Sequence, residues 1–279
     1  MHRPAVFRAG RRTGSESLII DAHSHVHDPI EAHVALLDQA GVDRAVLFGT
    51  RAHPERAVDL ASLHREMAVL GQALGGRANA IEGFRSAWRE LDVALAAWPE
   101  RFIGFGSVPL DLAPGDIAET VEREVVARGW HGVGELTPPP GRAGLIEPVL
   151  RAAADHGRLP VVVHGFAPTT ADDLKTLAAL AVRYPTVPLV VSQLGGLHWM
   201  QAVELVRDTP NMYLELSTAN IVFAVRLAIK EIPDRTLFGS DAPYGDPVLT
   251  RALVERVTGP GEVRERVLGG TMAALLGLD

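Results

Sequence analysis

The chain has 279 residues, a formal net charge of −7 at pH 7 and a hydrophobic content of 47%, which are ordinary values for a globular protein. The acidic balance argues against a nucleic-acid binder, and no apolar run approaches the roughly 18 residues that a membrane helix requires. Cysteine is absent, which excludes disulfides and thiolate ligands and suits a cytoplasmic protein. Any metal must therefore be held by nitrogen and oxygen.

The first 17 residues differ from the rest of the chain. They contain four arginines, at positions 3, 8, 11 and 12, but not the apolar stretch of a secretory signal. We predict a disordered leader over residues 1–17. No linker divides residues 18–279, so we predict a single domain there.

Short β-branched runs alternate with amphipathic segments along this domain. We predict strands at residues 18–23, 44–48, 102–108, 132–136, 160–164, 189–193, 212–216 and 236–240. We predict helices at residues 29–40, 55–71, 86–97, 117–127, 145–156, 171–182, 197–207, 221–231, 247–257 and 262–276. A strand and helix that repeat about every 30 residues, eight times, predict a parallel (β/α)₈ TIM barrel.

The interval between the second and third predicted strands is longer than the others. It holds about 50 residues and two predicted helices. Since this loop lies on the face where such barrels build their active sites, we expect the helical insertion to cap the substrate.

Polar side chains that suit a metal follow the predicted strands. His23 and His25 are one residue apart, so their rings point to the same side of the first strand. The strand ends of a barrel meet at one face, so we expect these side chains to converge. The predicted metal site consists of His23, His25, Glu135, His164 and Asp241.

Three segments resemble the amidohydrolase superfamily, and specifically its amidohydrolase-related (amidohydrolase 2) branch. They are residues 21–25, 163–165 and 238–243; the end, residues 267–277, resembles that branch's last helix, where Asn is usual at Thr271. The resemblance covers about residues 19–278 and implies a (β/α)₈ barrel with one or two divalent ions. It implies His23, His25, His164 and Asp241 as metal-site residues, with Asp241 handling the proton of metal-bound water.

Gln193 departs from this pattern, because the family normally has His there. An amide has no titratable proton near neutral pH, so Gln193 cannot act as a general acid or base. It can donate a hydrogen bond to a substrate oxygen or offer a weak oxygen ligand. His198 is a further source of the missing imidazole, and the number of ions stays open.

Several of these residues also have ordinary structural interpretations. Glu135 can pair with Arg142, and Asp241 can cap a helix. For the substrate, we expect contacts from residues that follow strand ends. The predicted substrate-binding residues are Arg51, Arg142, Trp199 and Tyr244, with the arginines able to bind a carboxylate.

The ligand set predicts Zn²⁺, with Mn²⁺ or Fe²⁺ as alternatives. Our leading hypothesis is a metal-dependent hydrolase of a small amide, lactone or ester, with Asp241 and Gln193 as catalytic residues. The alternatives are a non-oxidative decarboxylase of an aromatic or unsaturated acid and a catalytically silent binding barrel. The expected partner is a small-molecule substrate, with neither nucleic acid nor membrane, and family members often form homodimers.

Overall fold

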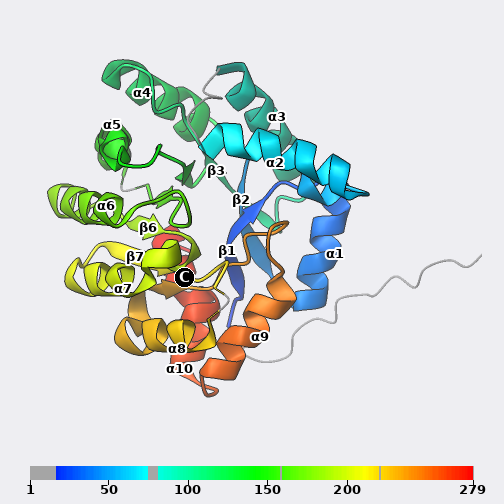
Figure 1. The fold of residues 1–279 in the computed structure, drawn as a ribbon, viewed down its shortest axis with the longest axis vertical. Coiled ribbons are helices and arrows are strands. Elements are labelled where there is room, and N and C mark those ends of the chain that lie inside the picture. The colour runs from blue at the N-terminus through cyan, green and yellow to red at the C-terminus, as the bar shows by residue number, and fades with distance from the viewer. Residues whose placement is uncertain (1–16, 75–80, 158, 220, 279) are drawn as a thin grey trace, which may run out of the picture.

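The computed structural model describes residues 17–74, 81–157, 159–219 and 221–278 (Figure 1). The predicted leader, apart from Ser17, lies outside these residues. Among the described helices, none combines the length and apolar character needed to span a membrane.

Within the described residues, eight parallel strands form one sheet in chain order, each paired with the next. They are β1 (Ile20–His25), β2 (Arg44–Phe48), β3 (Phe102–Gly106), β4 (Gly132–Leu136), β5 (Val161–Val163), β6 (Leu189–Val191), β7 (Met212–Glu215) and β8 (Thr236–Leu237). The sheet closes on itself where the chain leaves β8: the Ala22 amide of β1 donates to the Phe238 carbonyl at 2.9 Å. The predicted (β/α)₈ barrel is confirmed.

Most of the helices surround the strands as an outer ring, whereas the C-terminal helix packs against the barrel interior (Figure 1). The α-helices are α1 (Ile30–Ala40), α2 (Leu60–Leu74), α3 (Ile81–Ala97), α4 (Pro114–Val121), α5 (Glu147–Asp155), α6 (Ala171–Arg183), α7 (Trp199–Asp208), α8 (Val222–Glu231), α9 (Pro247–Val257), α10 (Glu262–Glu265) and α11 (Thr271–Leu276). The shorter 3₁₀ or π turns are η1 (Pro54–Arg56), η2 (Glu122–Val126), η3 (Ala143–Ile146), η4 (Gln193–His198), η5 (Pro233–Arg235) and η6 (Arg266–Gly270).

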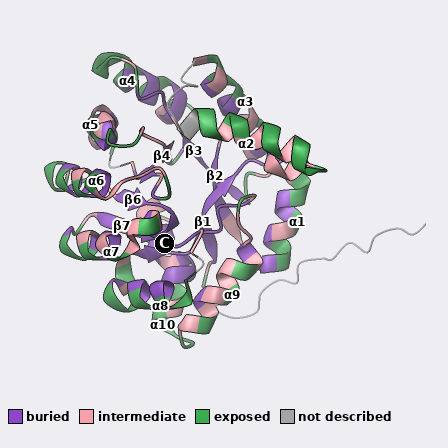
Figure 2. Cartoon of the chain, viewed as in Figure 1, coloured by how far each residue is buried: buried purple, intermediate pink, exposed green. Residues whose placement is uncertain are grey.

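The core has two layers, because successive strand residues point to opposite faces. Ile20, Phe48 and Phe105 fill the barrel interior, and Met272 of α11 packs into the same cluster. The other face of the strands packs against the helices, which bury one side and expose the other (Figure 2). The polar residues at the strand ends are thus carried by a rigid, densely packed frame.

The insertion between β2 and β3 divides into two parts. Helix α3 packs on β3 and buries Phe84, Trp88 and Leu91, so it occupies the ordinary crossover position of the barrel. Helix α2 is the added element and lies in front of the strands in Figure 1. Its residues Val69 and Leu70 line the cavity described below, which is where a cap over the substrate was expected.

Candidate metal centre

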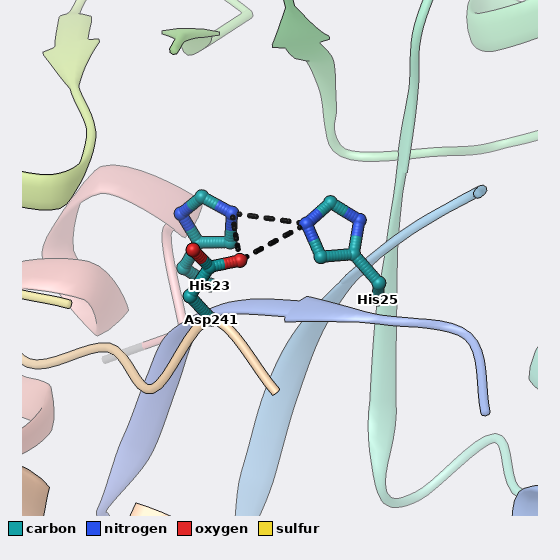
Figure 3. A group of neighbouring side chains, drawn as sticks. All are labelled: His23, His25 and Asp241. Atoms are coloured by element: carbon teal, nitrogen blue, oxygen red, sulfur yellow. Dashed lines mark hydrogen bonds and ion pairs between the residues drawn. The ribbon is translucent and has the colours of Figure 1, made fainter. Parts of the chain in front are cut away.

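His23 and His25 present their Nε2 atoms to each other at the end of β1. These atoms are 3.3 Å apart, and both residues are buried (Figure 3). Phe48 of β2 packs edge-on against the His23 ring, with centroids 5.0 Å apart. The wall that holds the two imidazoles is therefore fixed by the barrel core.

Asp241, which follows β8, completes a group of three. Its Oδ1 lies 3.4 Å from His23 Nε2 and 3.2 Å from His25 Nε2 (Figure 3). Among the described residues, no hydrogen-bond donor satisfies this buried oxygen. A buried carboxylate oxygen facing two imidazole nitrogens fits a divalent cation, which accepts both kinds of ligand.

Glu135, at the end of β4, brings a second carboxylate to the centre. Its Oε2 lies 3.8 Å from His23 Nε2 and 3.9 Å from His25 Nε2. Its Oε1 contacts His164 Nδ1 and the Gln193 amide nitrogen, each at 3.1 Å. Glu135 therefore links the two histidines of β1 with β5 and η4.

His164 lies beside this centre and faces Glu135. Its second ring nitrogen, Nε2, is 3.1 Å from the carbonyl oxygen of Ala167. Among the described residues, the group whose ligand atoms lie within 4.8 Å of one another is His23, His25 and Asp241. The structure thus brings His164 next to the cluster through Glu135.

The Gln193 side chain is oriented by four hydrogen bonds. Its Oε1 accepts from the amides of Gly165 at 3.0 Å and Phe166 at 3.2 Å. Its Nε2 donates to Glu135 Oε1 at 3.1 Å and to Asp241 Oδ2 at 3.3 Å. In this arrangement the amide oxygen faces the β5 loop, and both amide hydrogens tie the two carboxylates together.

Two further side chains support the centre and were absent from the sequence-based prediction. Thr218 Oγ1 donates to Asp241 Oδ2 at 3.0 Å, and Glu215 Oε2 contacts His23 Nδ1 at 3.0 Å. Glu215 could have been noticed as a lone carboxylate within the apolar strand β7. Thr218 carries no comparable signal.

Backbone strain is concentrated at the same strand ends. Gln193, Thr218 and Asp241 have φ values of 52°, 55° and 57°, a left-handed conformation that side chains other than glycine rarely adopt. Their side chains hydrogen-bond to one another at Asp241 Oδ2. Such strain costs stability and is found preferentially at functional sites.

The histidines and carboxylates of the centre shift one another's pKa values. Burial opposes ionisation of Asp241, but His23 and His25 outweigh it and hold the pKa of Asp241 well below its usual range. Burial likewise opposes, and His23 and His164 favour, the charge on Glu135, whose pKa is lowered. For His23, burial lowers the pKa, but Asp241 and Glu135 outweigh it and raise the pKa to about 10. Two ionised carboxylates in a buried position create a strong attraction for a cation.

A cavity of about 460 Å³ opens onto the centre. Its lining includes the polar residues of the centre: His25, Glu135, His164, Gln193 and Asp241. Most of its wall is apolar and includes Val69, Phe84, Val108, Leu110, Leu145 and Phe166.

Three of the predicted substrate-binding residues, Arg51, Arg142 and Tyr244, line this cavity. The Arg51 guanidinium lies 5.0 Å from the Phe84 ring centroid. Trp199 is not one of the described residues that line the cavity, and it packs against Phe223 instead, with centroids 5.9 Å apart. His198, at the end of η4, is likewise absent from the described lining.

Comparison with known proteins places these observations in a family. A sequence model described as amidohydrolase matches residues 20–278. No curated protein matches the sequence.

Several solved structures share the fold at low sequence identity. They include 5-carboxyvanillate decarboxylase from Sphingomonas paucimobilis, with 17% identity, a TM-score of 0.65 and coverage of 94% of this chain and 99% of the other. A dihydroxybenzoic acid decarboxylase from a Polaromonas species, solved with bound manganese, has 18% identity, a TM-score of 0.65 and coverage of 94% and 98%. The 4-oxalomesaconate hydratase from Rhodopseudomonas palustris has 15% identity, a TM-score of 0.64 and coverage of 93% and 96%.

Proposed function

The chain belongs to the amidohydrolase family of enzymes, and on that premise we propose that it is a metal-dependent, non-oxidative decarboxylase of an aromatic or unsaturated acid. The observation that carries this proposal is the cavity above the metal centre, whose mainly apolar wall also contains Arg51 and Arg142. Such a cavity suits a substrate that is both apolar and negatively charged. Two of the structural neighbours are decarboxylases of aromatic acids, which supports the same assignment.

In this proposal His23, His25 and Asp241 hold the ion, with Glu135 as the next nearest carboxylate. Zn²⁺ and Mn²⁺ both suit these nitrogen and oxygen ligands. A divalent ion bound there would supply positive charge to stabilise a negatively charged substrate. His164 as a further ligand stays a prediction, since its ring nitrogens contact Glu135 and the Ala167 carbonyl.

The surrounding side chains would orient the substrate. Arg51 and Arg142 would bind a carboxylate or phenolate, while Phe84 and Tyr244 would contact the ring. During the reaction the bond to the carboxyl group breaks, carbon dioxide leaves and a proton takes its place on carbon. That proton would come from water: the Asp241 carboxylate, whose Oδ1 faces the centre, would accept it and pass it to carbon, whereas the Gln193 amide cannot titrate.

A hydrolase of a small amide, lactone or ester is the second candidate. The Asp241 carboxylate favours it, because an ionised carboxylate beside two imidazoles would accept the proton of an attacking water and return it to the leaving group. The two candidates share a metal centre and differ in the substrate that the cavity accepts.

The test is a comparison of two substrate panels on protein reconstituted with Mn²⁺ or Zn²⁺. We expect carbon dioxide release from at least one hydroxybenzoic or unsaturated acid. Hydrolysis of an amide, lactone or ester without any decarboxylation would favour the second candidate. Bound metal without turnover in either panel would reject both and leave the catalytically silent barrel.

Arg51 provides the matching test of substrate binding. With the acid that is turned over, we expect Arg51→Gln to raise KM by about 10- to 100-fold, because it removes a charge-assisted hydrogen bond. Arg89→Gln is the control, since Arg89 is exposed on α3 and pairs with Glu82. An unchanged KM in Arg51→Gln would remove this residue from the substrate site.

A further inference from the structure

Glu215 is a buried carboxylate at the end of β7, behind the metal centre and outside the described lining of the cavity. Its Oε2 contacts His23 Nδ1 at 3.0 Å. The same oxygen accepts hydrogen bonds from the backbone amide of Gln193 at 3.1 Å and from Ser217 Oγ at 2.7 Å. The Ser217 amide donates to the other oxygen, Oε1. A carboxylate this fully surrounded by donors has a fixed position.

We propose that Glu215 is a positioning residue that fixes the ring of His23 for metal binding. The contact requires the proton of the neutral imidazole to lie on Nδ1, because a carboxylate only accepts. The lone pair of Nε2 then points toward His25 and Asp241. In Figure 3 dashed lines join one ring nitrogen of His23 to His25 and Asp241, and its other ring nitrogen points away from His25.

His25 provides an internal contrast. Its Nδ1 is buried, and none of the described residues hydrogen-bonds to it. The protein therefore determines the proton position and ring orientation of His23 more strongly than those of His25. Of the two histidines, His23 is therefore the one whose metal binding would depend on a carboxylate outside the centre.

The same carboxylate also connects β7 with the bend after β6. Its Oε2 binds both the His23 ring and the backbone amide of Gln193, whose φ is 52°. The Gln193 side chain in turn holds Glu135 and Asp241. Glu215 thus supports a histidine directly and two carboxylates through the Gln193 backbone.

Gly239 leaves the space that Glu215 occupies. A Cβ atom at this position would lie 2.2 Å from Glu215 Oε1 and 2.7 Å from its carboxyl carbon. The absence of a side chain at Gly239 therefore permits the carboxylate to reach His23. This gives a physical reason for glycine at a position outside the group of His23, His25 and Asp241.

The inference rests on the metal centre of the proposed function but not on the reaction. The experiment is a titration of metal-free protein with Co²⁺, followed by the visible absorption of the bound ion. We expect Glu215→Gln to weaken Co²⁺ binding by about 10- to 100-fold and to alter the spectrum, which reports ligand geometry. Urea unfolding of the metal-free proteins measures the accompanying loss of stability.

Asp173→Asn is the matched control. Asp173 is also a buried carboxylate, and it accepts hydrogen bonds from the amides of Gly141, Ala143 and Thr170, away from the centre. We expect a comparable loss of stability with Co²⁺ affinity within about twofold of wild type. If Glu215→Gln does not fold, Glu215→Asp replaces it, with weakened binding expected because the shorter side chain withdraws from His23.

The outcomes test the metal centre and the role of Glu215 separately. Wild-type protein that binds no Co²⁺ would reject the metal centre and with it this role of Glu215. Wild-type protein that binds Co²⁺ while the folded Glu215 variant binds it equally well, with the same spectrum, would reject the role of Glu215 alone.

Discussion

The two oxygens of the Asp241 carboxylate have different environments. Oδ2 accepts from Gln193 Nε2 and Thr218 Oγ1, whereas Oδ1 faces the two histidines of β1. Two donors therefore set the orientation of the carboxylate, and the remaining oxygen is left for an ion. The same division explains why Asn at this position would not be a neutral replacement.

We expect Asp241→Asn to weaken metal binding by more than about 100-fold. The substitution removes a negative charge, and whichever way the amide turns, it places a donor against histidines or against existing donors. Elemental analysis and Co²⁺ titration measure the effect. Asp246→Asn, at the N-cap of α9, is the control because Asn also caps helices. Full metal content in Asp241→Asn would contradict this assignment.

Gln193 is the residue at which the sequence departs from its family, and its amide meets two carboxylates. We expect Gln193→Glu to lower the free energy of unfolding by about 2–4 kcal/mol in metal-free protein, because two donors become acceptors that face Glu135 and Asp241. Urea unfolding in the presence of a chelator measures this loss.

A second Gln→Glu substitution, away from the centre, measures how much an added charge alone lowers the free energy of unfolding. Gln201 is a half-buried residue of α7 that donates one hydrogen bond, to the Ala171 carbonyl. We expect Gln201→Glu to lower the free energy of unfolding by less than about 1 kcal/mol. Equal losses in both variants would show that the Gln193 contacts do not stabilise the centre.

At the scale of elements, His53 joins the parts of the insertion. Its ring contacts Glu55 at 2.9 Å and Glu90 of α3 at 3.3 Å, and its backbone amide donates to Glu66 of α2 at 2.8 Å. Arg51, two residues earlier, lines the cavity. His53 therefore holds α2 through its backbone amide, while its buried imidazole joins the segment after β2 to α3.

This link predicts a pH-dependent stability. Burial lowers the pKa of His53, but hydrogen bonds to Glu55 and Glu90 outweigh it and raise the pKa to about 9, with Arg56 opposing. The folded state thus binds the proton more tightly than the unfolded state, whose pKa is 6.5. The stabilisation is complete below pH 6.5 and is lost as the pH rises through 9.

We expect wild type to lose about 1–2 kcal/mol more than His53→Gln between pH 6.5 and 9.5, a value reduced because Glu90 is partly exposed and its charge is screened. Urea unfolding at both pH values gives the difference. Identical pH dependence of the two proteins would show that His53 is not charged in the folded state.

At the scale of the whole molecule, Asp21 closes the barrel. It lies on β1, and its buried carboxylate accepts from the Ser240 amide at 2.9 Å and the His23 amide at 3.0 Å. Ser24 and Ser240 donate their hydroxyls to the other oxygen. The first and last strands are thus joined next to His23 and Asp241, so closure and the metal centre depend on each other.

We expect Asp21→Asn to lower the free energy of unfolding by about 1–2 kcal/mol, because an amide cannot accept from all four donors, a loss partly offset by removal of a buried charge. Burial raises the pKa of Asp21 to about 6, so urea unfolding is measured at pH 8, where the carboxylate is charged. Asp116→Asn, in the exposed first turn of α4, is the control. A loss below about 1 kcal/mol would show that the barrel closes without this network.

The sequence alone determined the fold and the face of the barrel that carries the candidate site. The alternation of apolar runs and amphipathic segments is local, and eight regular units permit few architectures other than a closed barrel. His23, His25, Glu135 and Asp241 could be found because each stands at a strand end. The insertion was visible as a long interval, but the sequence did not show that α3 packs on β3 while α2 lines the cavity.

Only the tertiary structure decided how those side chains are held. The contact of His23 with Glu215 joins residues 192 positions apart, and the bond from Gln193 to Asp241 spans 48. Such contacts depend on the register and closure of the whole barrel, which the local pattern of apolar residues does not predict. The sequence therefore supplied the candidate ligands, whereas the orientation of the Gln193 side-chain amide, the contact of Thr218 and the placement of Trp199 outside the described cavity lining required the folded chain.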